Sequence, residues 1–527
     1  MSIEHKNLIY WTILIALALG SVLIRFPKAN ENFYNADATY HVLLTMKAYD
    51  ETPISVHKFL PIVSLGQPED KFIPWGATVP DKFGNYYYTS FSPIGFLVPY
   101  LFIKFFHLPF SHNSLYIFNS ILYVMCMFLI VKLFIKLFDN IDKQFVIFIV
   151  GIAYLFQPEI MHSQGIVYWH QSLFQLIFIT QLILFERIRN KPENIRILIC
   201  FFALCLIAPY TEWTGFVSNF GFAIAFFFYF YKKRINFLKY PAIIFFLTSI
   251  SFTLFCLHYL TVIPANGFVN ALKARFIARN FNVNIEISLF VKSYIKSFGL
   301  LIIFVAAFMF LIMLSKSNKK IFFKIICERK EFLIVVCAAL FENIIMKQHA
   351  VAYSFDRMKM ILLVSFLLLS LISVLSNIFS RNIEGRKESL DVIVMPILAV
   401  LLMISTVNLY KYTHNSDGYK WSAPYLETNK TIARELSMQY TRDNSIFAHQ
   451  NVSTRGYANI LWNRGIYEGL PLDMLSNIAY ENDKRYIVMF DCDGGGYGIC
   501  MIILIIPFMI YKQTQLMMKG SSFNEHF

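Results

Sequence analysis

The sequence predicts an all-α polytopic membrane protein with a small extracytoplasmic α/β region at its C-terminal end. Hydrophobic residues make up 57% of the 527 positions, charged residues make up 15%, and the mean hydropathy is +0.53. A soluble globule could not cover this much apolar surface with polar side chains. Apolar stretches near the ~20 residues that cross ~30 Å of hydrocarbon recur along the chain, so we expect about 11–13 transmembrane helices.

The expected spans run from the N-terminus to residue 409. The first, 8–24, has no small-residue cleavage site before the polar segment that follows it, so we expect it to stay in the protein. A shorter apolar run at 91–107 contains two prolines and Lys104. The other expected spans are 115–137, 144–158, 168–186, 196–211, 214–231, 241–263, 293–315, 331–346, 358–379 and 391–409.

Basic clusters between the apolar runs predict the orientation. They alternate with loops that hold few Lys or Arg residues, and the positive-inside rule places such clusters in the cytoplasm. The four clusters are 187–191, 232–234, 316–324 and 381–387. The far, extracytoplasmic side then holds 26–90, 159–166, 211–213, 264–290, 347–357 and everything after about 410.

Segment 91–107 conflicts with this alternation if it crosses the bilayer completely. One interpretation makes it re-entrant or interfacial, which its prolines and Lys104 allow. The other interpretation moves a span boundary near 139–167, where both apolar segments are short and Pro158 interrupts them. The sequence leaves both open.

We expect two domains. The first, 1–409, is the transmembrane domain and includes a long extracytoplasmic loop, 26–90, with a short helix at 38–49. The second, 410–527, is a C-terminal extracytoplasmic region of ordinary soluble composition.

The C-terminal region combines a helical pattern near 427–440 with a β-like run at 485–490, which predicts a small α/β unit. The apolar run 498–511 is too short for a span. We expect the polar tail after it to be disordered.

The net charge of +14 does not indicate a nucleic-acid partner, because Lys and Arg gather in short clusters between apolar runs. Most cysteines lie inside apolar runs, but Cys492 and Cys500 could pair in an oxidising compartment. The chain has no Cys pair at two-residue spacing and no His-Glu-x-x-His motif. We therefore expect no metal site and no cofactor, while the sequence leaves a divalent metal open.

Asp37 follows the first span by about a dozen residues, close to the membrane surface. A carboxylate in a partly dry site has a raised pKa and can serve as a general base. His41 follows one helical turn later on the same face, within reach of a hydrogen bond or a phosphate. The alternative is that Asp37 only caps the expected helix, which it directly precedes.

An aromatic stretch then leads into the apolar run at 91–107. Residues 84–95 read Gly-Asn-Tyr-Tyr-Tyr-Thr-Ser-Phe-Ser-Pro-Ile-Gly and include Tyr88. Together with the first span and Asp37, this stretch resembles the membrane glycosyltransferases of the GT-C fold, in the branch of protein O-mannosyltransferases and lipid A aminoarabinose transferases. The pattern covers roughly the first 230 residues; beyond them only the alternation of spans and the far-side terminal region are similar.

Two departures from that family pattern stand out. Many relatives carry Asp-Glu where this chain has Asp37-Ala38, and a His or Lys before paired prolines where it has Phe91-Ser92-Pro93. The acidic role therefore rests on Asp37 alone, and the donor sugar is not predicted.

The resemblance implies transfer of a sugar from a polyprenyl-phosphate carrier to a glycan, lipid or protein acceptor on the far side of the membrane, usually with inversion. Asp37 would be the catalytic base that takes the proton of the acceptor hydroxyl. His41 and Tyr88 would bind substrate. We expect the enzyme in a bacterial inner membrane, surrounded by membrane lipids, where it modifies cell-envelope glycan or lipid.

Such a reaction needs a basic site for the lipid phosphate, and the loop 264–290 offers Lys273, Arg275 and Arg279 in a short amphipathic helix. Arg275 and Arg279 share a face, which Lys273 does not quite join. Basic residues on the far side oppose the positive-inside bias, so one explanation is a specific anion. The other is a helix that rests on anionic head groups. Its apolar residues would then lie on the lipid: Phe268, Leu272 and Phe276.

A second polar group follows the span 331–346. His349, Tyr353 and Arg357 recur at intervals of four, so one helical face would present them to phosphate or sugar hydroxyls. The alternative makes Tyr353 and Arg357 ordinary interface anchors.

Three further polar residues lie near the ends of expected spans. Glu342 and Asn343 lie deeper in the span 331–346, and ionisable residues inside a bilayer usually face a polar cavity. Glu212 lies in a tight far-side turn, where it could orient the acceptor or the donor. An interfacial turn flanked by Tyr and Trp is the alternative for Glu212.

Two other functions stay open: a transporter, and a polymerase or ligase, of polyprenyl-linked saccharide. A transporter would need charged residues along a mid-membrane path, and the sequence shows no internal repeat. A polymerase shares the many spans and the basic loop, but is not expected to depend on a carboxylate just after the first span. Asp37 therefore discriminates between these functions.

Overall fold

The computed structural model describes most of the chain, in two compact units. The described residues are 3–28, 35–73, 75, 77–233, 237–280, 285–382, 388–414, 424–449, 463–492 and 500–507. The membrane unit comprises 1–29, 113–257 and 276–419. The loop unit comprises 30–112, 258–275 and 420–527. The first loop and the C-terminal region thus pack in one unit, whereas the sequence analysis divided the chain at 409–410.

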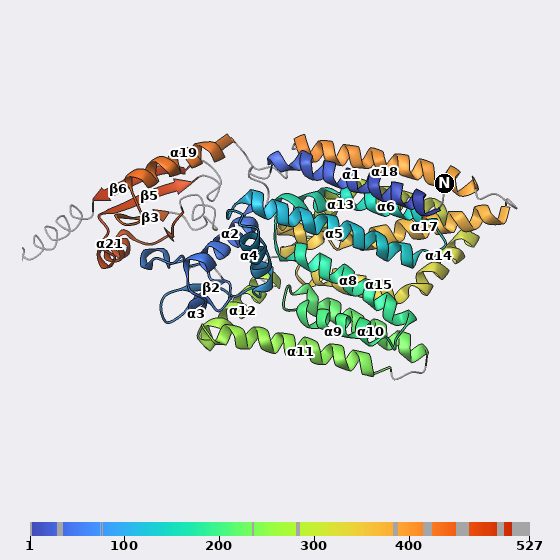
Figure 1. The fold of residues 1–527 in the computed structure, drawn as a ribbon, viewed down its shortest axis with the longest axis horizontal. Coiled ribbons are helices and arrows are strands. Elements are labelled where there is room, and N and C mark those ends of the chain that lie inside the picture. Colours follow the sequence, from blue (N-terminus) through green and yellow to red (C-terminus); the bar gives the residue numbers. More distant parts are fainter. Residues whose placement is uncertain are drawn as a thin grey trace, which may run out of the picture. The chain divides into compact units, whose positions relative to one another are not determined.

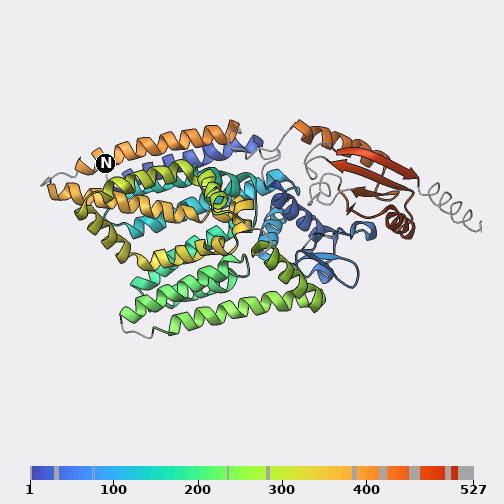
Figure 2. The same ribbon diagram turned by 180° about the vertical axis from the view of Figure 1, so that it is seen from behind.

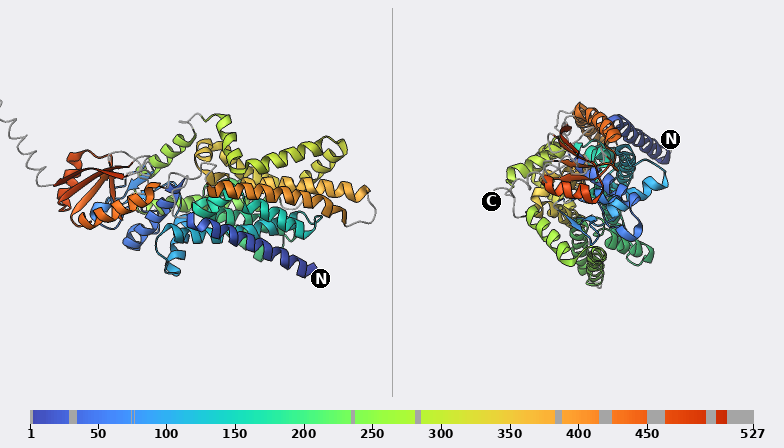
Figure 3. Two further views of the ribbon diagram at one scale, coloured as in Figure 1. Left: turned by 90° about the horizontal axis from the view of Figure 1, so that it is seen from above. Right: turned by 90° about the vertical axis from the view of Figure 1, so that its left-hand side faces the viewer.

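The membrane unit is helical throughout its described part, and its long helices run side by side (Figures 1 and 3). Its elements are α1 (Ile3–Arg25), η1 (Phe26–Lys28), α5 (His112–Leu137), α6 (Lys143–Leu155), α7 (Pro158–Met161), η3 (His162–Ile166), α8 (His170–Asn190), α9 (Ile195–Ile207), α10 (Thr214–Lys232), α11 (Lys239–Leu260), α13 (Ile287–Met313), α14 (Lys316–Glu328), α15 (Lys330–Ile345), α16 (Lys347–Ala352), η4 (Ser354–Arg357), α17 (Met360–Asn382) and α18 (Glu388–His414).

Eight helices of the described chain are long and apolar enough to cross a bilayer, and a bent pair formed by α6 and the segment α7–η3 brings the number to nine. The predicted polytopic all-α architecture is confirmed. Three predicted spans, 144–158, 196–211 and 331–346, contain helices of only 13, 13 and 16 residues. The long helices and these three short helices together account for the larger number of transmembrane helices that hydropathy predicted.

The bend between α6 and α7 measures 66° and has a local cause. Pro158 begins α7 and cannot continue the hydrogen-bond ladder of α6. The fully buried Arg25 donates from Nη1 to the carbonyl of Met161 at 2.5 Å and from Nε to the carbonyl of Ser21 at 3.0 Å. A Cβ on Gly165 would clash with Arg25 Nη1, so a larger residue here would have to displace the guanidinium from its place beside Met161.

The segment 91–107 forms helix α4, Ile94–Phe105, which has 12 residues. At 1.5 Å per residue it extends about 18 Å, too little to cross the hydrocarbon core. Its Lys104 pairs at an exposed position with Asp50, at 2.6 Å. The length of α4 agrees with the re-entrant or interfacial interpretation, and the bend at Pro158 shows that 139–167 is also not a pair of plain spans.

The loop unit mixes short helices with two small sheets. Its elements are α2 (Ala36–Glu51), α3 (Ile54–His57), η2 (Pro68–Asp70), β1 (Thr78–Pro80), β2 (Tyr86–Tyr88), α4, α12 (Ala265–Asn280), α19 (Pro424–Gln439), β3 (Ser445–His449), β4 (Ile466–Glu468), α21 (Leu472–Glu481), β5 (Tyr486–Cys492) and β6 (Cys500–Pro507). The helices predicted at 38–49 and 427–440 are confirmed, as is the strand at 485–490. The predicted disordered tail lies outside the described residues.

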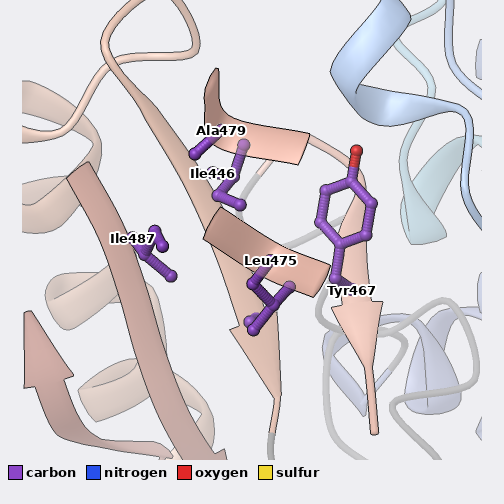
Figure 4. Packing of buried hydrophobic residues seen from close by; sticks show 6 residues of the cluster. Ile446, Tyr467, Leu475, Ala479 and Ile487 are labelled. Atoms are coloured by element: carbon purple, nitrogen blue, oxygen red, sulfur yellow. The ribbon is translucent and has the colours of Figure 1, made fainter. Parts of the chain in front are cut away.

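The C-terminal region forms a four-stranded sheet in the order β4-β3-β5-β6. Strand β3 pairs in parallel with β4 and β5, and β6 pairs with β5 in antiparallel fashion. Helices α19 and α21 lie beside this sheet (Figure 2). Residues of α21 pack on the strands, where Leu475 and Ala479 meet Ile446, Tyr467 and Ile487 (Figure 4). The predicted α/β unit is confirmed.

The apolar run 498–511 contributes strand β6 to this sheet. Cys492 and Cys500 are opposite each other in the β5–β6 backbone register. Their side chains are outside the described residues, so their pairing stays a prediction.

Charged side chains join the first loop to the C-terminal region inside the loop unit. Lys484 Nζ lies 2.8 Å from Glu69 Oε1, and both side chains are buried. Arg442 pairs with Asp70 and, at 3.2 Å, with Glu51. Buried charges need such partners because desolvation of an unpaired ion is costly. These ion pairs therefore stabilise the contact between the two segments.

Candidate functional site

Asp37 is the second residue of α2 and is half-buried. The residue before the helix, Asn35, has φ 63° and makes no side-chain capping bond. Asp37 therefore lies inside the first turn, and the alternative that it caps the helix is wrong. A carboxylate in a first turn is stabilised by the partial positive charge of the helix N-terminus.

His41 lies one turn further along α2, on the face that also carries Asp37. Its buried ring contacts the rings of Tyr88, Trp75 and Phe96, at centroid distances of 4.2, 5.1 and 5.6 Å. The structure therefore brings together two predicted substrate-binding residues, His41 and Tyr88, although 47 positions separate them in the sequence.

Helix α12 carries the predicted basic residues. Lys273 is exposed and Arg275 is half-buried. The backbone at Arg279 continues the helix, but its side chain lies outside the described residues. The helix predicted in this loop is thus present, and its basic character rests on Lys273 and Arg275 as described.

The apolar residues of α12 do not all face outward. Phe268 is buried and stacks on Tyr259, at a centroid distance of 5.1 Å, so the prediction that it lies on lipid is wrong. The hydroxyl of Tyr259 donates to the carbonyls of Tyr88 and Phe91 at 2.7 and 2.6 Å. Tyr259 therefore connects α12 to the aromatic stretch at 84–95. Phe276 is 52% exposed, and its contact with lipid stays a prediction.

The membrane unit contains a buried polar cluster that begins at Glu342 in α15. Lys359 Nζ donates to Glu342 Oε2 at 2.5 Å, and the hydroxyl of Thr214 donates to the same oxygen. Both charged side chains are buried. Glu342 thus has the polar surroundings that an ionisable residue in a span requires.

Asp356 extends this cluster. Its Oδ1 accepts a hydrogen bond from Gln171 Nε2 at 2.6 Å, and its Oδ2 contacts His349 Nδ1. Its carbonyl accepts from Asn343 Nδ2 at 3.0 Å. Gln171 Nε2 also donates to Glu212 Oε1 at 3.3 Å, so Gln171 connects Asp356 to Glu212.

Glu212 lies two residues before helix α10, and its Oε2 accepts the backbone N–H of Thr214 at 2.6 Å. The side chain is buried. Burial, together with the nearby charge of Glu342, raises the pKa of the Glu212 carboxyl above its ordinary range. This carboxyl therefore holds a proton more tightly than an exposed glutamate does.

Arg357 lies in a second buried group. Its Nε donates to Ser297 Oγ at 2.8 Å, and Nη1 donates to the carbonyl of Ala350. Its Nη2 lies 3.5 Å from Glu159 Oε2, and Glu159 also accepts from Ser297 at 2.7 Å. Arg357 and Glu159 are 2% and 0% exposed, so this pair is closed to solvent.

The prediction that His349, Tyr353 and Arg357 share one helical face is wrong. Helix α16 ends at Ala352, and Tyr353 has extended backbone angles of φ −116° and ψ 114°. Arg357 belongs to the separate turn η4. The rings of His349 and Tyr353 still meet at a centroid distance of 4.5 Å, while Arg357 turns to Glu159.

Similarity of this chain to known proteins is found at the level of the fold. No protein-family model matches the chain, and no curated protein matches it. ArnT from Cupriavidus metallidurans in the apo state matches with a TM-score of 0.55 and 9% identity, covering 93% of each chain. The complex of the same ArnT with undecaprenyl phosphate matches with a TM-score of 0.52 and 9% identity. The match covers 93% of this chain and 94% of the ArnT chain. A third match is the archaeal oligosaccharyltransferase AglB from Archaeoglobus fulgidus, in complex with an inhibitory peptide and a dolichol-phosphate. Its TM-score is 0.54 and its sequence identity is 12%, and the match covers 92% of this chain and 70% of AglB.

The chain has the GT-C fold. The predicted resemblance is therefore confirmed for the fold, and it extends well beyond the first 230 residues that carried it in the sequence. Identities of 9–12% do not transfer the roles of single residues, so each role has to come from geometry.

Several buried polar residues of this GT-C chain were not predicted. Glu159 and Lys359 lie at the ends of apolar runs, where an ionisable residue is costly. The argument that identified Glu342 could have identified both. Gln171 and Asp356 carry no such signal, because amides and acids near span ends are ordinary.

Within the described ranges, no three His, Cys, Asp or Glu side chains lie together in a way that could hold a metal ion. The expectation of a metal-independent reaction stays a prediction.

Proposed function

We propose that this chain transfers a sugar from a polyprenyl-phosphate carrier to an acceptor on the membrane face opposite the basic clusters. The main support is the GT-C fold over 93% of the chain, shared with a protein solved with undecaprenyl phosphate. AglB, solved with a dolichol-phosphate, shares the fold as well. The acceptor is a glycan, lipid or protein of the cell envelope, and the enzyme belongs to a bacterial inner membrane.

Asp37 is the general base in this proposal. The acceptor oxygen attacks the anomeric carbon while its proton moves to the Asp37 carboxylate. The bond between the anomeric carbon and the phosphate oxygen breaks, and the polyprenyl phosphate leaves with those electrons. Attack opposite the leaving group inverts the configuration. The half-buried place of Asp37 in the first turn of α2 supports this role.

Four residues of the loop unit bind substrate in this proposal. His41 and Tyr88 form an aromatic wall that suits the apolar face of a sugar ring. Lys273 and Arg275 supply positive charge for the carrier phosphate. Arg279 would add to this charge.

The membrane-unit residues Glu212, Glu342, His349, Tyr353 and Arg357 were also predicted to bind substrate. Their described contacts are mainly with other buried protein groups. We propose that they hold the polar end of the membrane unit in shape and do not touch the reacting atoms.

The substitution Asp37→Asn tests the function. The first step is to identify the envelope glycan that changes when the gene is deleted and returns with the wild-type protein. Asp37→Asn should then reduce its formation by about 10²–10⁴-fold, the usual contribution of a general base. Asp50→Asn is a matched control on the same helix, because Asp50 makes only an exposed ion pair with Lys104.

Full activity of Asp37→Asn at normal membrane levels would overturn the mechanism. A carrier lipid that accumulates with its sugar intact in the variant, while an unmodified acceptor also accumulates, would support it. Neutralising Arg275 tests the phosphate site separately. Arg275→Gln should weaken use of the donor far more than it lowers the amount of inserted protein.

A further inference from the structure

A groove opens in the membrane unit between helices α10, α11 and α15. Its volume is about 530 Å³, within the range of about 300–1,000 Å³ typical of ligand pockets. Trp213, Phe216, Phe252 and Ile345 form apolar walls. Phe252 and Ile345 are 46% and 44% exposed, so the groove faces the lipid surrounding these spans.

One charged side chain, Glu342, lines this groove. Its Oε2 accepts both hydrogen bonds described for the carboxylate, from Lys359 and Thr214. None of the described contacts of Glu342 involves its other carboxylate oxygen, Oε1. A carboxylate oxygen at the wall of an apolar groove strongly favours a ligand that donates a hydrogen bond, above all a cationic one.

The local balance of charge also favours a cation. Lys359 is the ammonium that interacts with three carboxyl groups in this cluster: Glu212, Glu342 and Asp356. His349 contacts Asp356 through Nδ1. Glu342 and Asp356, without counting Glu212, already outnumber Lys359 in this cluster, and an anionic ligand in the groove would meet repulsion from Glu342.

The position of the groove along the helices indicates the depth of the charged group. Trp213 stands directly before α10, and α15 ends at Ile345. The opposite ends of these two helices carry basic residues, at 232–234 and 329–330. The groove therefore lies at the end of the spans away from the basic clusters, and Trp at a span end marks the head-group level.

We propose that this groove binds a phospholipid with a primary-amine head group, of the phosphatidylethanolamine type. Its ammonium donates to Glu342, and one acyl chain lies along Trp213, Phe216 and Phe252. The hydroxyl-bearing residues Ser249 and Thr253 also line the groove. The proposal is independent of the proposed glycosyl transfer.

The test uses the full-length protein in nanodiscs that contain equal amounts of phosphatidylethanolamine and phosphatidylglycerol. Retained lipids are counted by native mass spectrometry after the surrounding bilayer is removed. The wild type should retain the amine lipid over phosphatidylglycerol by about tenfold, as expected for a hydrogen bond to a charged group. Phosphatidylcholine, whose head group has no N–H, should be retained less than phosphatidylethanolamine.

Two variants and a control separate binding from folding. Glu342→Gln should abolish the preference for the amine lipid, but it also alters the Lys359 pair. Ser249→Trp fills the groove from an exposed position on α11 and should abolish retention while leaving that pair intact. Leu254→Trp, exposed on the same helix and outside the groove lining, should retain lipid like the wild type.

Equal retention of both lipids by the wild type would overturn the proposal. Retention that survives Ser249→Trp would overturn it as well, because the lipid would then bind elsewhere. Preferential retention of phosphatidylglycerol or of a polyprenyl phosphate would show that the groove accepts an anion, against the charge argument.

Discussion

Lys359 Nζ lies 2.5 Å from Glu342 Oε2, and the two side chains are only 5% and 10% exposed. They come from α15 and from the short link before α17. Each charge would be strongly disfavoured in this place without the other. The pair therefore fixes how the two segments meet at the polar end of the membrane unit.

Lys359→Met should destabilise the protein by about 3–5 kcal/mol, because it leaves the Glu342 carboxylate buried without its cation. Lys324→Met is the control: Lys324 is 77% exposed and pairs weakly with Glu328 at 4.0 Å. Its removal should change stability by less than about 0.5 kcal/mol. Thermal unfolding in detergent measures both. A loss for Lys359→Met no larger than for Lys324→Met would contradict the importance of the pair.

The double variant Glu342→Gln with Lys359→Met provides an internal check. It removes both charges, so it should be less destabilised than the sum of the two single variants by at least about 1 kcal/mol. Strict additivity would show that the two groups do not interact in solution.

Gly165→Ala should disturb the bend between α6 and α7. The new Cβ would clash with Arg25 Nη1, and this guanidinium cannot move without losing its bond to Met161. Overpacking of this kind costs about 1–3 kcal/mol. Gly20→Ala in α1 has no atom within 4 Å of its new Cβ, so it should be neutral or stabilising by up to about 1 kcal/mol. Similar melting temperatures for the two variants would mean that Arg25 is placed differently.

The loop unit should lose stability in mild acid through His57. Burial lowers the pKa of His57 from 6.5 to about 4, and its Nδ1 accepts the N–H of Phe59 at 2.9 Å. Between pH 6.5 and 4, the unfolded chain therefore binds a proton at His57 that the folded chain does not bind. Stability is unaffected by this group above pH 6.5 and falls as the pH drops toward 4.

The change His57→Asn isolates this contribution, because an amide oxygen can accept the same N–H without titrating. Unfolding of both proteins is compared at about pH 8 and about pH 5. The wild type should lose more stability over this interval than the variant. Equal losses would exclude His57 as the responsible group.

Lys484→Met should loosen the contact between the first loop and the C-terminal sheet. It leaves Glu69, which is 7% exposed, without its cation, at a cost of about 3–5 kcal/mol. Limited proteolysis should then cut the C-terminal region faster. Lys82→Met, at an exposed position of the same unit, is the control and should leave the rate unchanged. Faster cleavage in both variants would point to a general effect of losing a lysine.

The sequence predicted most elements because their signals are local. Apolar length predicted the spans, and periodicity predicted the helix at 38–49 and the strand at 485–490. Local reasoning was wrong where two short elements meet. The spacing of His349, Tyr353 and Arg357 suits one helix, yet the chain turns extended at Tyr353.

The sequence by itself determined that this is a polytopic membrane protein with a soluble α/β region, because hydropathy and segment length follow from the order of residues alone. Tertiary structure decided which charges meet. Glu342 with Lys359, Glu159 with Arg357 and Glu69 with Lys484 are separated by 17, 198 and 415 positions. A buried charge needs a partner because its desolvation is costly, but only the packed fold determines which residue provides that partner.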